Sequence, residues 1–207
     1  MKLEAYLKET YAFSRGDLEQ VQHLFYEERI KKGEYYLQEG QYINKVSFIS
    51  EGLFRLFYQI DGEEKNMLFF SENQFMTDYY GYLTQSVSIR PIQALEDAVV
   101  YSINRGNLNK LFDNSKNWER IGRLFAESAY LLAVSRAGRL LHDDYDTRVG
   151  IFIKENPTLL QRIPQYMVAS YLNMTPETLS RVKRRLMKKG HQLNSLYEND
   201  LDLWSHG

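Results

Sequence analysis

Six lysine and arginine side chains lie within nine consecutive residues, from Arg181 to Lys189. The chain as a whole is nearly neutral, with a formal net charge of −1 at pH 7. Between Arg162 and Gly190 the charges sum to +6, so the rest of the chain carries −7. Guanidinium and ammonium groups at this density can neutralise phosphates. The local charge asymmetry therefore predicts a polyanionic partner that the whole-chain charge does not indicate.

The residues around this basic run predict two helices that meet at a tight turn. The first helix is expected from Pro164 to about Leu172, because proline suits the first helical position. Asn173 can adopt the left-handed conformation that a sharp turn requires. Thr175 is a natural N-cap for the second helix, and Gly190 would end that helix as its C′ residue. The apolar side chains expected to join the two helices are Val168, Ala169, Leu172, Leu179, Val182 and Leu186.

Polar and basic side chains gather on the opposite face of the second predicted helix. In the major groove, arginine can donate two hydrogen bonds to guanine and glutamate can accept one from cytosine. Glu177 and Arg181 are four residues apart and share this face, and the later cations would contact phosphates. The alternative is a solvated surface helix. That interpretation does not explain why the turn residue, the N-cap and the basic face occur together. The predicted DNA-binding residues are Thr175, Pro176, Glu177, Ser180, Arg181, Arg184, Arg185, Lys188 and Lys189.

A stretch of 27 residues without proline, from Asn117 to Asp143, predicts one long helix. Two leucines repeat at a spacing of seven, and small residues near the same stripe would let another helix approach closely. A helix buried in the core of a single chain is the alternative interpretation. The breadth of the apolar surface favours dimerisation, with an expected interface of Leu124, Ser128, Leu131, Ser135 and Gly138.

The sequence pattern of the N-terminal half changes from helical to strand-like at about residue 30. Residues 1–29 are predicted to be helical from the spacing of Leu18, Val21, Leu24 and Phe25. Residues 33–103 hold short aromatic and β-branched runs between glycines, which is typical of an all-β sandwich or barrel, with Asp61-Gly62 as a hairpin turn. Residues 75–83 interrupt this pattern and are expected to form a short helix or loop.

Several chemistries are excluded by composition. The chain has no cysteine, which rules out disulfides, thiolate metal sites and cysteine nucleophiles and is typical of a reducing cytosol. A metal-dependent enzyme on a cupin-like barrel would need clustered histidine and carboxylate ligands. None of the four histidines falls among the predicted strands: His23, His142, His191 and His206. We therefore expect no enzymatic activity, no metal and no cofactor.

Neither a membrane span nor a signal peptide is expected. The sequence has no apolar run of the roughly 20 residues that a span requires. Its first residues mix acids with bases and lack the apolar stretch of a signal peptide. A cytoplasmic protein without membrane contacts is the expectation.

Over nearly its full length the sequence resembles the Crp/Fnr family of bacterial transcription regulators. The stretch "VASYLNMTPETLSRVKRRL" is similar to the helix-turn-helix of that family, with Glu177 and Arg181 at its base-reading positions. Residues 31–75, "KKGEYYLQEGQYINKVSFISEGLFRLFYQIDGEEKNMLFFSENQF", resemble its cyclic-nucleotide-binding-like β-roll, glycines included. The long predicted helix lies where the family has its dimerisation helix.

The resemblance implies an α+β fold in three parts. Residues 1–115 would form an antiparallel, jelly-roll-like sensory β-roll, residues 116–142 the dimerisation helix, and residues 143–207 a winged helix-turn-helix that binds DNA. The protein would be a homodimer on a pseudo-palindromic operator in double-stranded DNA, with RNA polymerase as a further partner. An alternative is a ligand-binding regulatory module whose C-terminal helices dock a protein.

The nucleotide pocket departs from the family pattern. Members that bind cyclic AMP hold the ribose with a Gly-Glu-Leu helix start and the phosphate with an Arg-Ser/Thr-Ala segment. Here Thr77-Asp78 replaces Gly-Glu, and Ser88 replaces the arginine. Arg90 shares strand parity with Ser88 and could supply a cation, or it could be a solvated edge residue. The resemblance thus implies a β-roll that does not bind cyclic AMP.

The Tyr-rich segment near the expected pocket leaves the effector open. These aromatic side chains could simply belong to the core, or they could accept an apolar or aromatic effector, and it is equally open whether an effector exists. The residues expected around an effector are Phe70, Thr77, Asp78, Tyr79, Tyr82, Ser88 and Arg90.

Overall fold

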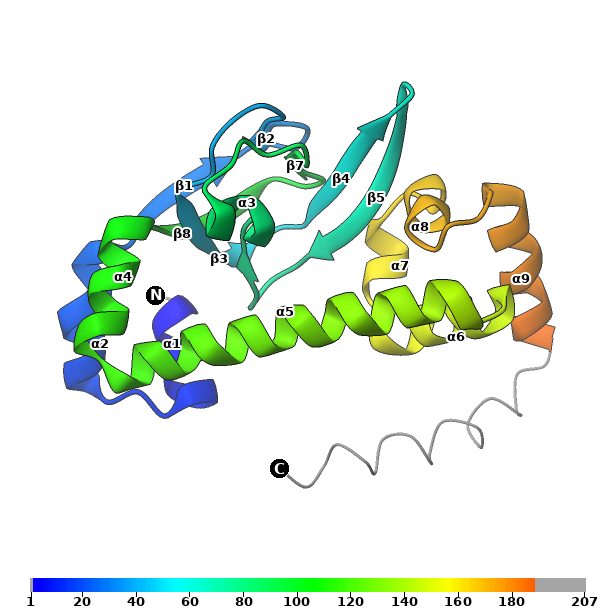
Figure 1. Cartoon of the computed structure of the whole chain (residues 1–207). Helices are drawn as coiled ribbons and strands as arrows, with labels where there is room; N and C mark the ends of the chain where they lie inside the picture. Colours follow the sequence, from blue (N-terminus) through cyan, green and yellow to red (C-terminus); the bar gives the residue numbers. More distant parts are fainter. Residues whose placement is uncertain (1, 189–207) are drawn as a thin grey trace. The chain divides into compact units, whose positions relative to one another are not determined.

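The structure is a computed structural model that describes residues 2–188 (Figure 1). The chain divides into two compact units, residues 1–133 and residues 134–207. The boundary between them falls inside one long helix, α5 (Lys116–His142). A single helix over this stretch was predicted from the sequence and is confirmed.

Two four-stranded antiparallel sheets form the body of the first unit. Their strand orders are β1-β8-β3-β6 and β2-β7-β4-β5. The predicted α+β class with antiparallel sheets is therefore confirmed. The strands are β1 (Tyr26–Ile30), β2 (Tyr35–Leu37), β3 (Lys45–Glu51), β4 (Phe54–Ile60), β5 (Glu63–Phe70), β6 (Phe75–Met76), β7 (Ile92–Ala94) and β8 (Ala98–Asn104).

Side chains from both sheets meet in one apolar core. Phe48 and Ile49 of β3, Phe54 of β4, Ile92 of β7 and Val100 of β8 are all fully buried within it. Strand β8 shows the alternation that a two-faced strand needs, because its buried positions recur at every second residue over most of its length. The core explains why these aromatic and β-branched runs are strands.

The predicted hairpin turn between β4 and β5 is confirmed. Asp61 and Gly62 both have positive φ, 51° and 80°. Two consecutive residues with positive φ match the twist of a two-residue hairpin, and such residues are usually Asn, Asp or Gly. Ile60 and Glu63 are the first pair of the ladder that follows.

The N-terminal segment is only partly helical. It forms α1 (Lys2–Tyr11), α2 (Arg15–Val21) and the 3-10 turn η1 (Gln22–Leu24). The prediction of helix up to residue 29 is wrong, because Tyr26–Ile30 is β1, which pairs along its whole length with β8. Hydrogen bonds to a distant strand satisfy the backbone groups of these residues. This pairing outweighs the helix that the local apolar spacing predicts.

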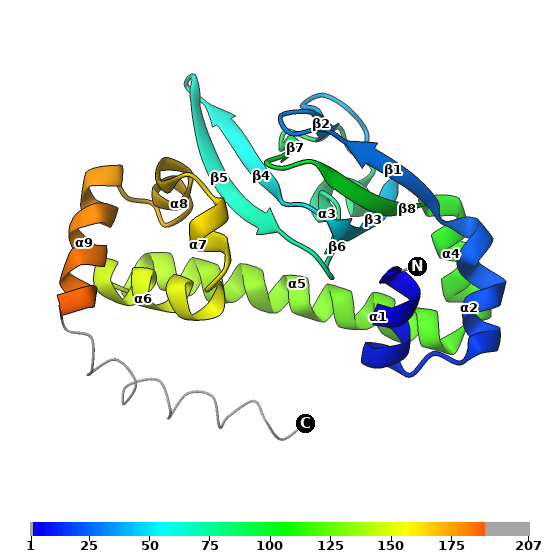
Figure 2. The same ribbon diagram turned by 180° about the vertical axis from the view of Figure 1, so that it is seen from behind.

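Helices α1 and α2 lie beside the first turns of α5, as both views show (Figures 1 and 2). Phe13, which precedes α2, packs edge-on against Trp118 of α5, with ring centroids 5.5 Å apart. Two further helices follow strands of the roll, α3 (Tyr79–Thr84) and α4 (Arg105–Asn114). Residues 75–83 thus form the short strand β6 and most of α3. The short helix expected there is confirmed, whereas the first two residues form a strand that was not predicted.

The second unit contains four helices after α5 within the described residues. They are α6 (Tyr145–Glu155), α7 (Leu159–Arg162), α8 (Gln165–Tyr171) and α9 (Pro176–Lys188). Val149 and Phe152 of α6 are buried in this unit, as are apolar side chains of α8 and α9. The predicted wing and the predicted helix end at Gly190 lie outside the described residues. Among the described helices, none combines the length and apolar character needed to cross a bilayer.

Candidate functional site

The turn between α8 and α9 has the backbone that the sequence predicted. Asn173 has a φ of 53°, in the left-handed region. The Met174 amide donates to the Ala169 carbonyl at 3.0 Å, and the Leu172 amide donates to Val168 at 3.0 Å. These bonds satisfy the last carbonyls of α8 and reverse the chain within a few residues. Pro164 lies one position earlier than predicted, at the N-cap of α8.

Thr175 caps α9 as predicted. Its side-chain oxygen accepts a hydrogen bond from the Thr178 amide at 3.2 Å, and its carbonyl accepts one from the Leu179 amide at 3.0 Å. Pro176 is the first residue of the helix, where the N–H that it lacks would have no helical partner. Cap and proline together fix where α9 starts and therefore which side chains point to each face.

Helix α9 has one buried face and one exposed basic face. The apolar residues predicted to join α8 and α9 are all buried: Val168, Ala169, Leu172, Leu179, Val182 and Leu186. The predicted base-reading side chains Glu177 and Arg181 are exposed, and so are Pro176, Ser180 and Arg184. Lys188 is the last residue of α9, and Lys189 lies outside the described residues.

At the start of α9, hydrogen bonds favour the ionised form of Glu177 and orient the Arg181 side chain. A backbone amide in the first turn lowers the pKa of Glu177, with smaller contributions from the Thr175 hydroxyl and from nearby Arg181. The carboxylate is therefore ionised at neutral pH, and in that form it acts only as a hydrogen-bond acceptor. Arg181 Nη2 donates to the Thr178 hydroxyl oxygen at 3.2 Å.

Arg185 differs from the other predicted DNA-binding residues because it is ion-paired within the unit. Its Nε lies 2.7 Å from Oδ2 of Asp146 in α6, and its Nη2 contacts the second carboxylate oxygen. This two-point contact ties α9 to α6. The sequence pattern gave no signal for it, because the two residues lie far apart in the chain.

Two arginines that the sequence analysis did not single out hold the end of α8. Arg148 of α6 donates to the Leu172 carbonyl at 2.8 Å. Arg136 of α5 donates to the Tyr171 carbonyl at 3.0 Å, and its guanidinium lies 4.1 Å from the centre of the Tyr171 ring. Positive groups suit the carbonyl end of a helix. The turn that positions α9 therefore depends on side chains from two other helices.

In the β-roll, three of the predicted effector residues form a closed polar cluster. Asp78 is 1% exposed, and its Oδ2 accepts from the Ser88 hydroxyl at 2.6 Å. Its Oδ1 lies 2.7 Å from Nη2 of Arg90, whose side chain is 11% exposed. The alternative of Arg90 as a solvated edge residue is therefore wrong. A side chain at Gly81 would meet Asp78 Oδ2 at 2.7 Å, so glycine there leaves room for the cluster.

The other predicted effector residues lie elsewhere. Thr77 is buried and donates its hydroxyl to the Lys45 carbonyl at 3.0 Å. Phe70 of β5 packs against the core. Tyr79 and Tyr82 of α3 line an apolar pocket, and burial raises the pKa of both hydroxyls. The predicted set thus splits between a polar cluster, the core and a pocket.

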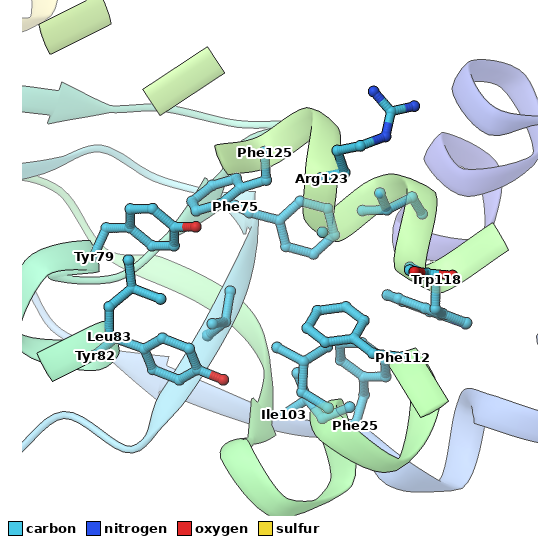
Figure 3. Close-up of a pocket in the computed structure, with 15 residues that line it drawn as sticks. Phe25, Phe75, Tyr79, Tyr82, Leu83, Ile103, Phe112, Trp118, Arg123 and Phe125 are labelled. Atoms are coloured by element: carbon cyan, nitrogen blue, oxygen red, sulfur yellow. The ribbon is translucent and has the colours of Figure 1, made fainter. Parts of the chain in front are cut away.

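This apolar pocket has a volume of about 300 Å³ and lies between α3, α4, the first turns of α5 and the roll (Figure 3). Seven aromatic side chains line it: Phe25, Phe75, Tyr79, Tyr82, Phe112, Trp118 and Phe125. Most of them were not predicted as site residues. The sequence did contain a signal for them, since Trp118, Gly122 and Phe125 are spaced to lie on one face of α5. This spacing indicates that the first turns of the helix pack against other elements.

Several apolar side chains of α5 are exposed. Of the five predicted interface residues, Ser128, Leu131 and Ser135 are exposed, and Leu131 has an exposed fraction of 52%. Leu124 and Gly138 are half-buried, and a Cβ added at Gly138 would meet no atom within 4 Å. Further exposed apolar residues on the same helix are Tyr130, Leu132, Val134, Leu140 and Leu141. Exposed apolar side chains on a helix can be covered by a partner at an interaction site.

Comparisons with known proteins agree with this architecture. Residues 27–115 match the family described as the cyclic nucleotide-binding domain. No curated protein matches the chain. The solved structure of FixK2 from Bradyrhizobium japonicum is similar, with a TM-score of 0.71 and 19% identity over 80% of this chain and 86% of that one.

Two further solved structures extend the likeness over most of the chain. A CooA mutant from Carboxydothermus hydrogenoformans has a TM-score of 0.70 and 15% identity, covering 89% of this chain and 84% of its own. A protein from Eubacterium rectale described as a transcriptional regulator of the Crp/Fnr family has a TM-score of 0.66 and 14% identity, covering 90% and 89%. The chain therefore has the same fold as these three structures, one of which is described as a regulator of the Crp/Fnr family, and its residues 27–115 match the cyclic nucleotide-binding domain family.

Proposed function

We propose that this protein is a transcription regulator of the Crp/Fnr type that binds double-stranded DNA through α9. The observation that carries the proposal is the two-faced character of α9. Its apolar face is buried against its own unit, whereas Glu177 and Arg181 are exposed near its capped N-terminal end. In this proposal α8, the turn and α9 form a helix-turn-helix, and residues 143–207 form the winged DNA-binding domain.

The roles of the side chains follow from their distance along α9. Glu177 and Arg181 lie in the first two turns, where a recognition helix meets base edges. Arg184 lies on the same exposed face one turn later, and Lys188 and Lys189 would reach phosphates. Arg181 is hydrogen bonded to a neutral hydroxyl, so exchanging that bond for a guanine edge does not break an ion pair.

Arg185 has a different role in the proposal. Its pairing with Asp146 occupies Nε and Nη2 and offsets its charge, so only the remaining N–H groups of the Arg185 guanidinium are available to DNA. We therefore infer that Arg185 positions α9 against α6, and that its own contribution to DNA affinity is smaller than that of Arg181.

The working form is proposed to be a homodimer joined through α5. The exposed apolar side chains of α5 support this, because a second copy of the same helix would cover part of them. Two copies of α9 would then read a pseudo-palindromic operator with half-sites about one helical turn, or a multiple of it, apart. Residues 1–115 would act as the sensory part, residues 116–142 as the dimerisation helix, and RNA polymerase would be a further partner.

The test starts by selecting the fragments of the host genome that the purified protein binds. Arg181→Ala should then weaken binding to the selected site by about 1–3 kcal/mol and relax specificity at one position in each half-site. Lys188→Ala should weaken binding to all sequences alike and flatten the salt dependence by about one unit. Arg15→Ala removes the same charge from an exposed position of α2, outside the proposed DNA-binding and dimerisation elements, and serves as the matched control.

Two results would contradict the proposal. If no genomic fragment is enriched, α9 does not read DNA, and docking to a protein becomes the better explanation of its basic face. If Arg181→Ala weakens specific and random DNA equally, Arg181 is a phosphate contact and the proposed base-reading role is wrong.

A further inference from the structure

The apolar pocket beside α3 differs in place and chemistry from the Asp78 cluster. None of Asp78, Ser88 and Arg90 is among the residues that line it. Protein interiors hold few voids larger than a water molecule, since each one forfeits packing contacts. At about 300 Å³ this pocket has roughly twice the volume of a cavity, about 150 Å³, that binds benzene. It therefore has room for a molecule with two fused rings.

Two lining side chains carry buried donors that have no partner. Within the described part of the chain, the Tyr82 hydroxyl and the Trp118 indole N–H make no hydrogen bond. Both residues are more than nine-tenths buried, with exposed fractions of 6% and 2%. Figure 3 shows the Tyr82 hydroxyl on the side of its ring that faces Ile103, another residue of the lining. An unpaired buried donor is costly and calls for an acceptor.

The remaining polar residues of the lining do not suit a charged ligand. Glu119 and Arg123 are exposed, and Arg123 is ion-paired with Glu127 at 2.6 Å. Figure 3 shows the Arg123 guanidinium pointing away from the cavity. A phosphate or carboxylate in the pocket would lose its hydration without gaining a cation. A cyclic nucleotide is therefore excluded from this pocket.

We propose that this pocket binds a neutral, bicyclic aromatic molecule that carries one hydrogen-bond acceptor. The aromatic walls contact its ring faces and edges, and the Tyr82 hydroxyl donates to its acceptor. The proposal concerns binding alone and holds whether or not α9 binds DNA. The ligand would touch α3 and α5 at once, because Tyr79 and Phe125, whose ring centroids are 5.1 Å apart, both line the site.

Quinoline and naphthalene are matched probes for this site. They have the same shape, and only quinoline carries an acceptor, its ring nitrogen. Equilibrium dialysis against the purified full chain should show that both bind and that quinoline binds about three- to tenfold more tightly, as expected for one net hydrogen bond. Failure of both probes to bind would overturn the proposal, and equal affinity would overturn the hydrogen bond.

The Tyr82→Phe variant isolates the hydroxyl. It keeps the ring and removes only an unpaired polar group, so the thermal unfolding midpoint should not fall. Naphthalene should bind as it does to the unchanged protein, and the advantage of quinoline should disappear. An advantage that persists in Tyr82→Phe would refute the role assigned to this hydroxyl.

A second variant tests the location. Leu83 lines the pocket and is 54% exposed, so Leu83→Trp can narrow the pocket without crowding the core. Binding of both probes should fall at least tenfold. Ile60→Trp, at another exposed apolar position outside the lining, should leave binding unchanged. Equal binding to Leu83→Trp and to the unchanged protein would place the ligand elsewhere and overturn the site.

Discussion

At the scale of single residues, the buried Asp78 carboxylate determines whether the expected nucleotide pocket can hold a phosphate. Each of its carboxylate oxygens has a partner, the Ser88 hydroxyl at 2.6 Å and the Arg90 guanidinium at 2.7 Å. A phosphate that approached Arg90 would have to displace a buried carboxylate of the same sign. The arginine that could replace the family's phosphate-binding residue is thus already neutralised.

Cyclic AMP and cyclic GMP are therefore expected not to bind. Titration calorimetry on the purified protein should show no heat of binding with either nucleotide at millimolar concentration. Ser88 can donate one hydrogen bond but brings no charge, and the loss of a charged partner in such a site costs about a thousandfold in affinity. Micromolar binding that disappears in Arg90→Ala would contradict this and identify Arg90 as the phosphate ligand.

The buried pair should also contribute to stability. Asp78→Ala leaves the Arg90 charge buried without its carboxylate, and we expect the free energy of unfolding to fall by about 3–5 kcal/mol. The double variant Asp78→Ala/Arg90→Ala should be less destabilised than the sum of the two single variants, because the two residues interact directly. Urea unfolding of all four proteins measures this coupling, and additive effects would show that the pair is not coupled.

At the scale of elements, the start of α9 depends on a local cap. Thr175→Ala leaves the Thr178 amide without its acceptor and should lower the free energy of unfolding by about 1 kcal/mol. Thr158→Ala is a matched control, since Thr158 precedes α7 without making a side-chain cap bond. Denaturant unfolding of both variants should show a loss for the first alone. Equal losses would mean that the cap bond does not stabilise α9.

At the scale of the whole molecule, the exposed apolar side chains of α5 predict the oligomeric state. Light scattering should show a dimer at micromolar concentration. Leu131→Glu would bury an unpaired charge in the interface and should release the monomer. Tyr166→Glu makes a similar change at an exposed position of α8 and should remain dimeric. A monomeric unchanged protein would contradict both the interface and the proposed operator geometry.

The sequence by itself determined the features that rest on local rules. Asn173 at positive φ, the Thr175 cap and the Asp61-Gly62 turn were all predictable, because each depends on conformational preferences within a few residues. The buried face of α9 was predictable too, because the apolar periodicity of a helix records which side is covered. Antiparallel strands over residues 33–103 followed from the same kind of pattern.

Only the tertiary structure decided the features that join distant parts of the chain. Residues 26–30 became a strand because β8 offered a ladder, although their local pattern favoured a helix. Arg90 became a buried partner of Asp78, and Arg185 a partner of Asp146, because folding brought opposite charges within hydrogen-bonding distance. The aromatic pocket arises in the same way, since its walls come from strands and helices that a sequence pattern does not place side by side. Periodicity shows which face of an element is covered, whereas the identity of the covering residue depends on long-range packing.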